Sequence, residues 1–445
     1  IYPTTNFKAI EQVTVERGEG CYVWDNHGNK YLEGLAGLWC TALGYGNQEV
    51  IATATEQMNK LTFNHMFGGK THQVAIDLAD KLADMIPMKD AVISFGNSGS
   101  DANDTHIKLL RYYHEAIGKP HCRKIIARER SYHGVTVAAA SLTGLPVTQN
   151  HFDLPVDALG ILRTDHPHYY RGKQGEETEV EFVDRIVGNL EAMILREGPD
   201  TIAAFIAEPI TGASGVIVPP EGYYQKVQAV LNRYDIMFWA DEVITGFGRT
   251  GSDFGCNTMG IESPDMMTFA KQLSSAYMPI SASAINREMY TAMIEQTATA
   301  GAFGHGYTYS GHPVACAVAL KVLEIYQRDE IFEKAAITGK YLQKRLAEFS
   351  DHPLVGEVRG SGLLGAIELV ADKKTGQPFV GGAVGGYAQK MAQDSGLLIR
   401  AVAGSSLGFC PPLIITEPQI DELIGKVSIA LDKTLEHCHK HSLIV

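Results

Sequence analysis

The chain has 445 residues, of which 45% are hydrophobic and 20% are charged, which is typical of a soluble globular protein with more than one domain. No apolar run reaches the roughly 18 residues of a membrane-spanning helix, and we expect no signal peptide and no membrane partner. A net charge of −13 argues against nucleic acid as a partner. Seven scattered cysteines without a CxxC pair predict reduced thiols in a cytoplasmic protein.

The N-terminal region predicts short strands. Residues 21–37, CYVWDNHGNKYLEGLAG, contain two apolar runs on either side of Asp25, Asn26, His27 and Gly28, a pattern typical of a hairpin.

The middle of the chain alternates between short β-rich runs and longer helical stretches. The helical stretches include residues 100–118 and 221–235. The β-rich runs are residues 90–95, 124–129, 202–209, 236–243, 265–270 and 280–285. Such alternation predicts an α/β domain around a mainly parallel sheet.

The pattern changes near Pro313. A long helical run over residues 314–349 precedes LVGEVRGSGLLGAIELV, another helix and GLLIRAV. We predict a large domain over residues 56–312. A smaller α+β domain is expected to combine residues 1–55 with residues 313–445.

Two chemically useful side chains follow neighbouring predicted strands. Asp241 ends the run FWAD, and Lys271 ends DMMTFAK, so both should lie at the carboxyl edge of the sheet, where ligands of open α/β sheets bind. Either could be an ordinary surface or capping residue. Together they match the lysine Schiff base and the carboxylate partner of a pyridinium nitrogen in pyridoxal phosphate (PLP) enzymes.

Two further motifs fit the same chemistry. SFGNSGSDAND ends a strand and opens a helix at Ser100, so its free backbone N–H groups could bind phosphate or form a plain capping turn. SYHG follows another strand, and its Tyr132 could stack on an aromatic cofactor or belong to the core.

The order of these motifs resembles that of class III aminotransferases, which are PLP enzymes of fold type I. FGNSGSDAND, SYHG, AEPI, ADEVITGFGRTG, PDMMTFAK and GYTYSGHP occur in the family's order, and the resemblance runs from about Trp24 to about Pro412. EGLAGLWC and GLLIRAV are similar to the pyruvate-dependent ω-transaminases within that class.

The resemblance implies a role for each matching residue. Lys271 would form the Schiff base and act as the catalytic base and acid, and Asp241 would hold the ring nitrogen. The remaining cofactor-binding positions would be Ser98, Gly99, Ser100, Tyr132, His133, Glu208, Val243 and, from a neighbouring subunit, Thr308. The substrate-binding positions would be Trp39, Phe67, Tyr132, Ala213 and Arg400. No metal is expected.

The implied activity is transfer of an amino group from an amine or ω-amino acid to pyruvate, by a ping-pong mechanism that passes through pyridoxamine phosphate. An aminomutase, a racemase or a decarboxylase could use the same lysine and aspartate, and taurine, GABA or polyamines could be the donor. A homodimer is expected, with a tetramer left open. The chain departs from the family at Gln272, where glycine usually follows the lysine.

Other patterns carry less weight. GSGLLG, residues 360–365, matches a dinucleotide-binding motif but precedes a predicted strand instead of a helix. The tail EHCHKHS is predicted to be frayed and solvated, not a metal site. Arg249 is expected to form a structural ion pair, and His65, His72 and His133 to have satisfied polar roles.

Overall fold

The computed structural model describes residues 12–444 and is built around a seven-stranded sheet. Six strands run in one direction and β10 runs against them, so the sheet is mainly parallel, as predicted. In spatial order the strands are β4 (Val92–Gly96), β10 (Ser281–Ile285), β9 (Met266–Phe269), β8 (Met237–Asp241), β7 (Ile202–Ala207), β5 (Lys124–Arg128) and β6 (Ile161–Thr164).

The two faces of this sheet pack against different helices. On β8, Trp239 belongs to an apolar cluster with residues of α4 (Gly99–Ala116) and α10 (Arg287–Ala300). Its neighbours Phe238 and Ala240 belong to the main core with other helices. Because side chains alternate along a strand, Asp241 lies on the α4 side with Trp239. The other helices before residue 330 are α1 (Ala36–Trp39), α2 (Gln48–Lys60), α3 (Gln73–Met85), α5 (Val137–Leu142), α6 (Tyr169–Gly172), α7 (Glu179–Glu197), α8 (Tyr223–Arg233), α9 (Gly255–Met259) and α11 (Pro313–Arg328).

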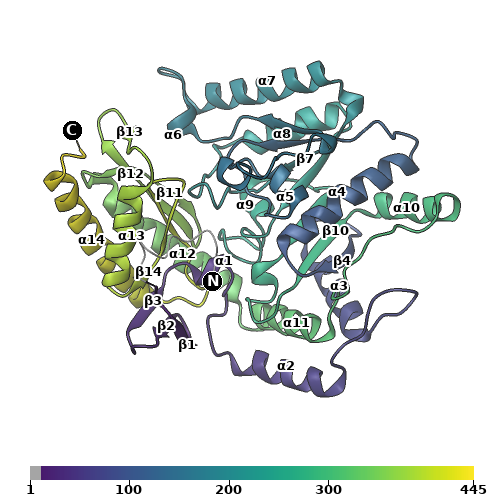
Figure 1. Ribbon diagram of the computed structural model, residues 1–445, viewed down its shortest axis with the longest axis horizontal. Helices are drawn as coiled ribbons and strands as arrows, with labels where there is room; N and C mark the ends of the chain where they lie inside the picture. Colours follow the sequence, from purple (N-terminus) through teal and green to yellow (C-terminus); the bar gives the residue numbers. More distant parts are fainter. Residues whose placement is uncertain (1–11, 445) are drawn as a thin grey trace.

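The two ends of the chain build the second part of the molecule together. Figure 1 shows the first strands in purple beside the yellow-green C-terminal elements. One sheet contains β1 (Val15–Glu19), β2 (Tyr22–Asp25), β3 (Lys30–Glu33) and β14 (Leu397–Leu398), and β14 pairs in parallel with β3. A second sheet contains β11 (Val355–Ser361), β12 (Leu364–Asp372), β13 (Gln377–Pro378), β15 (Arg400–Val402) and β16 (Ser406–Phe409). This α+β arrangement of N- and C-terminal segments was predicted.

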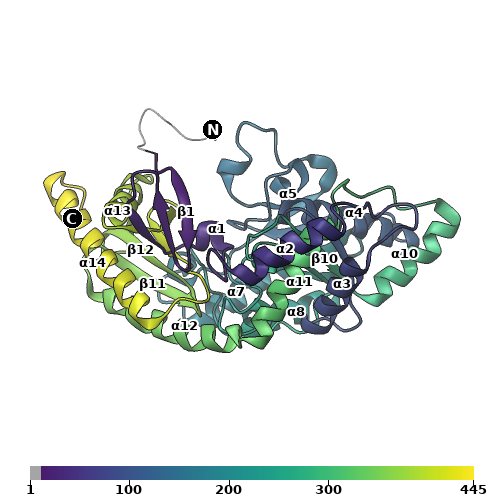
Figure 2. The same ribbon diagram turned by 90° about the horizontal axis from the view of Figure 1, so that it is seen from below.

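Helices complete the C-terminal part: α12 (Ile331–Ala347), α13 (Ala383–Asp394) and α14 (Glu417–Lys440). Figure 2 shows α14, in yellow, along the outer edge of the molecule. The predicted helical run over residues 314–349 is two helices, because the chain turns at Glu330, whose φ is +50°. GSGLLG forms the β11–β12 turn, not a nucleotide-binding loop.

The predicted frayed tail is wrong. Helix α14 continues to Lys440, because Cys438 is fully buried and the His437 ring stacks on Tyr387 with their centroids 4.0 Å apart. Within residues 12–444, none of the helices is long and apolar enough to cross a membrane.

The predicted domain limits stay a prediction, although the helices favour a refinement. The limit between residues 55 and 56 falls inside α2, and α11 packs against α2 and α3. Limits before Gln48 and after Arg328 would keep these three helices together.

Candidate active site

The carboxyl ends of several strands of the large sheet meet at one cavity of about 740 Å³. Asp241 ends β8, Lys271 follows β9, Ser98 and Gly99 follow β4, and Tyr132 follows β5. Twelve of the residues singled out in the sequence line this cavity: Trp39, Ser98, Gly99, Ser100, Tyr132, His133, Glu208, Ala213, Asp241, Val243, Lys271 and Arg400. The prediction that the carboxyl edge of the sheet forms the site therefore agrees with the geometry.

Lys271 occupies a constrained position at the cavity wall. Its backbone φ is +45°, a left-handed conformation that is uncommon for a residue with a side chain. Its Nζ lies 5.4 Å from the centroid of the Trp39 ring, and none of the carboxylates within residues 12–444 forms an ion pair with it. Burial lowers the pKa of the Lys271 ammonium, although the charges of Cys40 and Asp241 oppose the shift. A lysine of this kind is a suitable nucleophile and proton carrier.

Asp241 is held by three N–H donors. Its Oδ2 accepts hydrogen bonds from His133 Nδ1 at 2.8 Å and from Asn103 Nδ2 at 3.1 Å, and its Oδ1 accepts one from the Val243 N–H at 3.1 Å. The side chain is only 3% exposed. Since a carboxylate has about four acceptor positions, one remains on Oδ1 for a donor in the cavity.

The start of α4 combines a helix cap with open backbone donors. Ser98 Oγ accepts from the Asp101 N–H at 3.2 Å, and the Asp101 carboxylate accepts in return from the N–H groups of Asn97 and Ser98. The cap uses these donors and leaves the N–H groups of Gly99 and Ser100 at the positive end of the helix, where an anion binds favourably.

The SYHG loop is fixed against this helix start. Ser100 Oγ accepts from the Val135 N–H at 3.1 Å. A Cβ on Gly134, whose φ is +128°, would lie 2.5 Å from Ser100 Oγ, and a Cβ on Gly99 would lie 3.0 Å from Val243 Cγ2. The glycines therefore allow the close approach of three loops that converge on the cavity.

Glu208 also organises this loop. Its carboxylate accepts from the Tyr132 N–H and from the Gly212 N–H, both at 2.9 Å, and burial raises its pKa. Tyr132 is thus placed at the cavity wall by its own backbone.

The cavity rim, which we define as Trp39, Ala213, Arg400 and residues 401–404, is different in character. Arg400 is exposed and forms no ion pair with any carboxylate within the described part of the chain. The Trp39 Nε1 is buried without a hydrogen-bond partner in the described structure. The rim therefore presents an available cation beside an aromatic ring.

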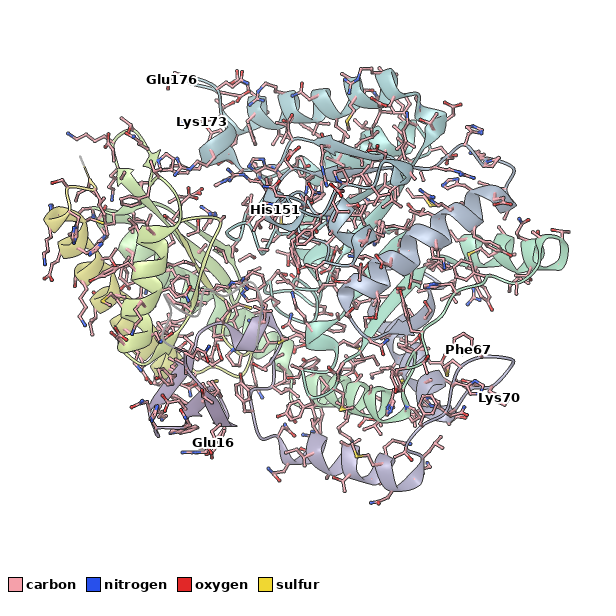
Figure 3. The ribbon with its side chains drawn as sticks, viewed as in Figure 1. Glu16, Phe67, Lys70, His151, Lys173 and Glu176 are labelled. Carbon is pink, nitrogen blue, oxygen red and sulfur yellow. The ribbon has the colours of Figure 1, made fainter. Side chains whose placement is uncertain are left out.

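Two predicted residues lie outside this cavity. Phe67 lies beside Lys70 on the loop between α2 and α3 at the right of Figure 3 and lines a second cavity of about 550 Å³ with residues 305–307. Thr308 is exposed next to that cavity. Neither residue reaches the Lys271 cavity of its own chain, and the role of Phe67 at the substrate stays a prediction.

The prediction that Arg249 forms a structural ion pair is wrong. Its side chain is fully buried, yet its Nη1 donates to the carbonyl oxygens of Leu363 and Pro411 and not to a carboxylate. It joins the loop after β8 to the C-terminal part of the chain.

A potential metal cluster outside the cavity is neutralised by arginines. His168, Glu357 and Glu368 lie close enough to share an ion. However, Arg359 contacts both carboxylates, and Arg171 donates to Glu368 at 2.6 Å. The cluster is an ion-pair network between α6 and the β11–β12 hairpin.

Sequence reasoning missed the polar groups below the cavity. Asn103 and Thr268 are fully buried and form hydrogen bonds that lead to Asp241. Asn103 stands on the face of α4 that buries Ala102, His106 and Ile107. A polar side chain on a buried helix face was the available signal.

The residues that line the cavity fit pyridoxal phosphate. The site joins a lysine of lowered pKa, a carboxylate with one open acceptor position and a helix start with open N–H donors, within a space of suitable size. This combination defines a PLP-dependent enzyme of fold type I.

Comparisons with known proteins give the family. The family model for class III aminotransferases matches residues 5–431. A chloroplastic γ-aminobutyrate transaminase 3 of Solanum lycopersicum is 48% identical over 427 residues, which cover 96% of this chain and 81% of the relative. A probable mitochondrial γ-aminobutyrate transaminase 3 of Oryza sativa subsp. indica is 47% identical over 433 residues, covering 96% and 83%.

A solved structure agrees. The omega transaminase of Pseudomonas jessenii in complex with PMP has a TM-score of 0.95 and 48% identity, and the match covers 98% of this chain and 96% of that one. The chain belongs to the class III aminotransferases, and it is a PLP-dependent aminotransferase. The expected fold, cofactor and enzyme class are confirmed.

Proposed function

We propose that this aminotransferase is an ω-transaminase that moves an amino group from an amine or ω-amino acid to pyruvate. The observation that carries the proposal is Arg400, an exposed arginine without a carboxylate partner in residues 12–444, on the same rim as Trp39. An arginine fork binds a carboxylate through two parallel hydrogen bonds. If Arg400 turns outward, the rim leaves an apolar space for a donor without a carboxylate.

The residues around Lys271 have roles that follow from their positions. Bound pyridoxal phosphate supplies the electron-withdrawing ring and carries the amino group between the two half-reactions. Lys271 holds the cofactor and moves the substrate proton as general base and acid. Asp241 would accept the ring N–H at its open acceptor position. Ser98, Gly99 and Ser100 would hold the cofactor phosphate.

The other lining residues orient the ring. Val243 would pack on one face of the ring, and Tyr132 would pack on the other face and contact the substrate. His133 holds Asp241 and Glu208 holds the Tyr132 backbone, as their hydrogen bonds indicate. Ala213 limits the substrate space beside Trp39.

Phe67 and Thr308 reach the site from a second copy of the chain. Phe67 lines the cavity of about 550 Å³, and the exposed Thr308 follows its lining residue Tyr307. In one chain, Phe67 is 44% exposed and Tyr309 61% exposed. An apolar surface of this kind supports a homodimer whose active sites are shared. Sedimentation of the holoenzyme tests this, because a monomer with full activity contradicts it.

A specific finding favours γ-aminobutyrate as a second candidate donor, because relatives 46–48% identical carry that name. The proposal of pyruvate as acceptor and the choice of donor are tested together. The visible absorption of the PLP-loaded protein is followed during addition of γ-aminobutyrate or of 1-phenylethylamine, and then of pyruvate or 2-oxoglutarate.

Each outcome of this experiment has a distinct meaning. Loss of absorption with either donor, followed by recovery and equimolar alanine with pyruvate, supports the proposal. A response to γ-aminobutyrate alone selects the narrower donor. Recovery with 2-oxoglutarate but not with pyruvate rejects pyruvate as the acceptor while leaving the aminotransferase intact.

A further inference from the structure

Below Asp241 lies a chain of fully buried polar side chains outside the cavity lining. Trp239 is on β8, Thr268 on β9 and Asn103 on α4, and each has no exposed surface. Asp241 and Thr268 are partners in the parallel pairing of β8 with β9, so their side chains point to the same face of the sheet. Helix α4 packs against that face and brings Asn103 between them.

The donors and acceptors of these hydrogen bonds can be assigned in only one consistent way. Asn103 Nδ2 lies 2.6 Å from the His133 carbonyl oxygen and 3.1 Å from Asp241 Oδ2, which are both acceptors. The amide nitrogen must therefore face them, and Asn103 Oδ1 must accept. Thr268 Oγ1 donates to it at 2.7 Å.

The hydrogen bond at Trp239 requires the same assignment of donors and acceptors. The indole N–H of Trp239 can only donate, and it lies 2.8 Å from Thr268 Oγ1. The Thr268 oxygen accepts this bond, so its own hydrogen is free to go to Asn103. His106 Nδ1, 3.1 Å from the same oxygen, fits as a further donor.

We propose that Asn103 and Thr268 are positioning residues for Asp241, a role that rests on the proposed function of Asp241 toward the cofactor ring. The chain directs a second N–H donor at Asp241 Oδ2. With His133 on the same oxygen, Oδ2 is occupied, and Oδ1 is the oxygen left for the ring nitrogen. Thr268 donates to Asn103 Oδ1 and so holds the amide in this orientation, which acts on the cofactor without a direct contact.

The first test compares Thr268→Val and Thr268→Ser with wild type. Valine keeps the shape but cannot donate, so Asn103 Oδ1 is left without its donor and the amide is held less firmly. We expect PLP to dissociate about tenfold faster from Thr268→Val. We also expect the pH midpoint of the bound PLP spectrum to move upward, because a less protonated ring withdraws fewer electrons from the Schiff base nitrogen. Thr268→Ser should restore both values.

Thr434→Val is the matched control. Thr434 is also fully buried and donates at 2.6 Å to the Ala430 carbonyl within α14, outside the active site. It should leave PLP release and the spectrum unchanged. If Thr268→Val folds and also matches wild type in both measurements, the proposed role is wrong.

Asn103→Asp keeps the test decisive where the valine variant does not fold. It places a second carboxylate beside Asp241 Oδ2. Two adjacent carboxyl groups are most stable when they share one proton. We expect weak PLP retention at neutral pH that recovers as the pH falls. Retention equal to wild type at every pH would overturn the proposal.

These measurements use PLP binding and its spectrum, not turnover. A wild-type protein that shows the spectrum but no transfer to pyruvate refutes the proposed acceptor and leaves the role of Asn103 and Thr268 to be judged by the variants alone.

Discussion

The floor of the cavity and its rim solve opposite problems with polar side chains. We call Asn103, His133, Asp241 and Thr268 the floor. Each of these residues is at most 3% exposed, and hydrogen bonds join them directly to one another. On the rim, Arg400 is exposed and has no carboxylate partner within residues 12–444.

The difference follows from what each region must recognise. A cofactor ring presents the same nitrogen in both half-reactions, so a floor with one arrangement of donors serves it throughout. The substrates differ, since one carries a carboxylate and the other need not. An arginine held by no fixed partner can pair with the first and withdraw from the second. Substitutions in the two regions test this contrast.

Lys271→Ala should abolish catalysis while the residues of the floor stay unchanged. We expect turnover to fall about a thousandfold or more, because the variant loses both the Schiff base and the proton carrier. The visible absorption of the Schiff base should disappear while phosphate contacts still retain some PLP. Lys426→Ala is the control, since Lys426 donates to the Gly396 carbonyl away from the cavity. Substantial turnover in Lys271→Ala would show that another group carries the proton.

Arg400→Leu should separate the two half-reactions at the rim. The reaction with pyruvate should slow by about a hundredfold, because two charge-assisted hydrogen bonds are lost. The reaction with a neutral amine should stay near the wild-type rate. Arg400→Lys should recover part of the pyruvate rate, since it restores the charge without the fork. Equal losses in both half-reactions would contradict the division between floor and rim.

The sequence predicted the part of this contrast that depends on strand ends. Asp241 and Lys271 each end an apolar run, so their meeting at one sheet edge followed from an α/β pattern. Asn103 could not be assigned in this way. Its partners Asp241 and Thr268 are 138 and 165 residues away, and its side chain alone does not show which acceptors it meets.

Phe67 marks a different limit of sequence reasoning. Its position in the family pattern pointed to the substrate pocket, yet within one chain it lies at the second cavity. Position along a chain does not state which copy of an assembly supplies a side chain. Arg249 shows a third limit, since burial of a cation predicts partners but not whether they are carboxylates or carbonyl oxygens.

Stability should also depend on pH through His106, whose Nδ1 lies 3.1 Å from Thr268 Oγ1 of the floor. Burial lowers the pKa of His106 to about 3 from 6.5, although the Asp241 charge opposes the shift. Below pH 6.5 the unfolded chain binds a proton at His106, whereas the folded protein binds it only near pH 3. The free energy of unfolding therefore decreases as the pH falls from 6.5 toward 3.

Between pH 7 and pH 5, His106 should cost the wild-type protein about 2 kcal/mol of unfolding free energy. Urea unfolding of the cofactor-free protein measures this, and His106→Gln should lose less stability over the same interval. His27→Gln, in the exposed β2–β3 turn, serves as the control. Parallel pH profiles for wild type and His106→Gln would mean that folding does not lower the pKa of His106.

Gln272 stands where the chain departs from the glycine usual in its family. Gln272 Nε2 donates to the carbonyl oxygens of Ile244 at 2.8 Å and Gly246 at 2.9 Å. The backbone carbonyl of Gln272 accepts a hydrogen bond from the Tyr326 hydroxyl at 2.7 Å. The side chain thus ties the loop that carries Lys271 to the loop that carries Val243.

Gln343 allows a matched comparison, because its Nε2 also bridges two backbone carbonyls, those of Gly362 and Leu364, away from the cavity. Both Gln272→Met and Gln343→Met should lower stability by about 1–3 kcal/mol, since each leaves carbonyls unpaired. Only Gln272→Met should also weaken PLP binding, by about threefold to tenfold, as Val243 loses its fixed distance from Lys271. Measured PLP affinities that fall equally in both variants would show that the loss reflects general stability, and that the floor does not extend to Gln272.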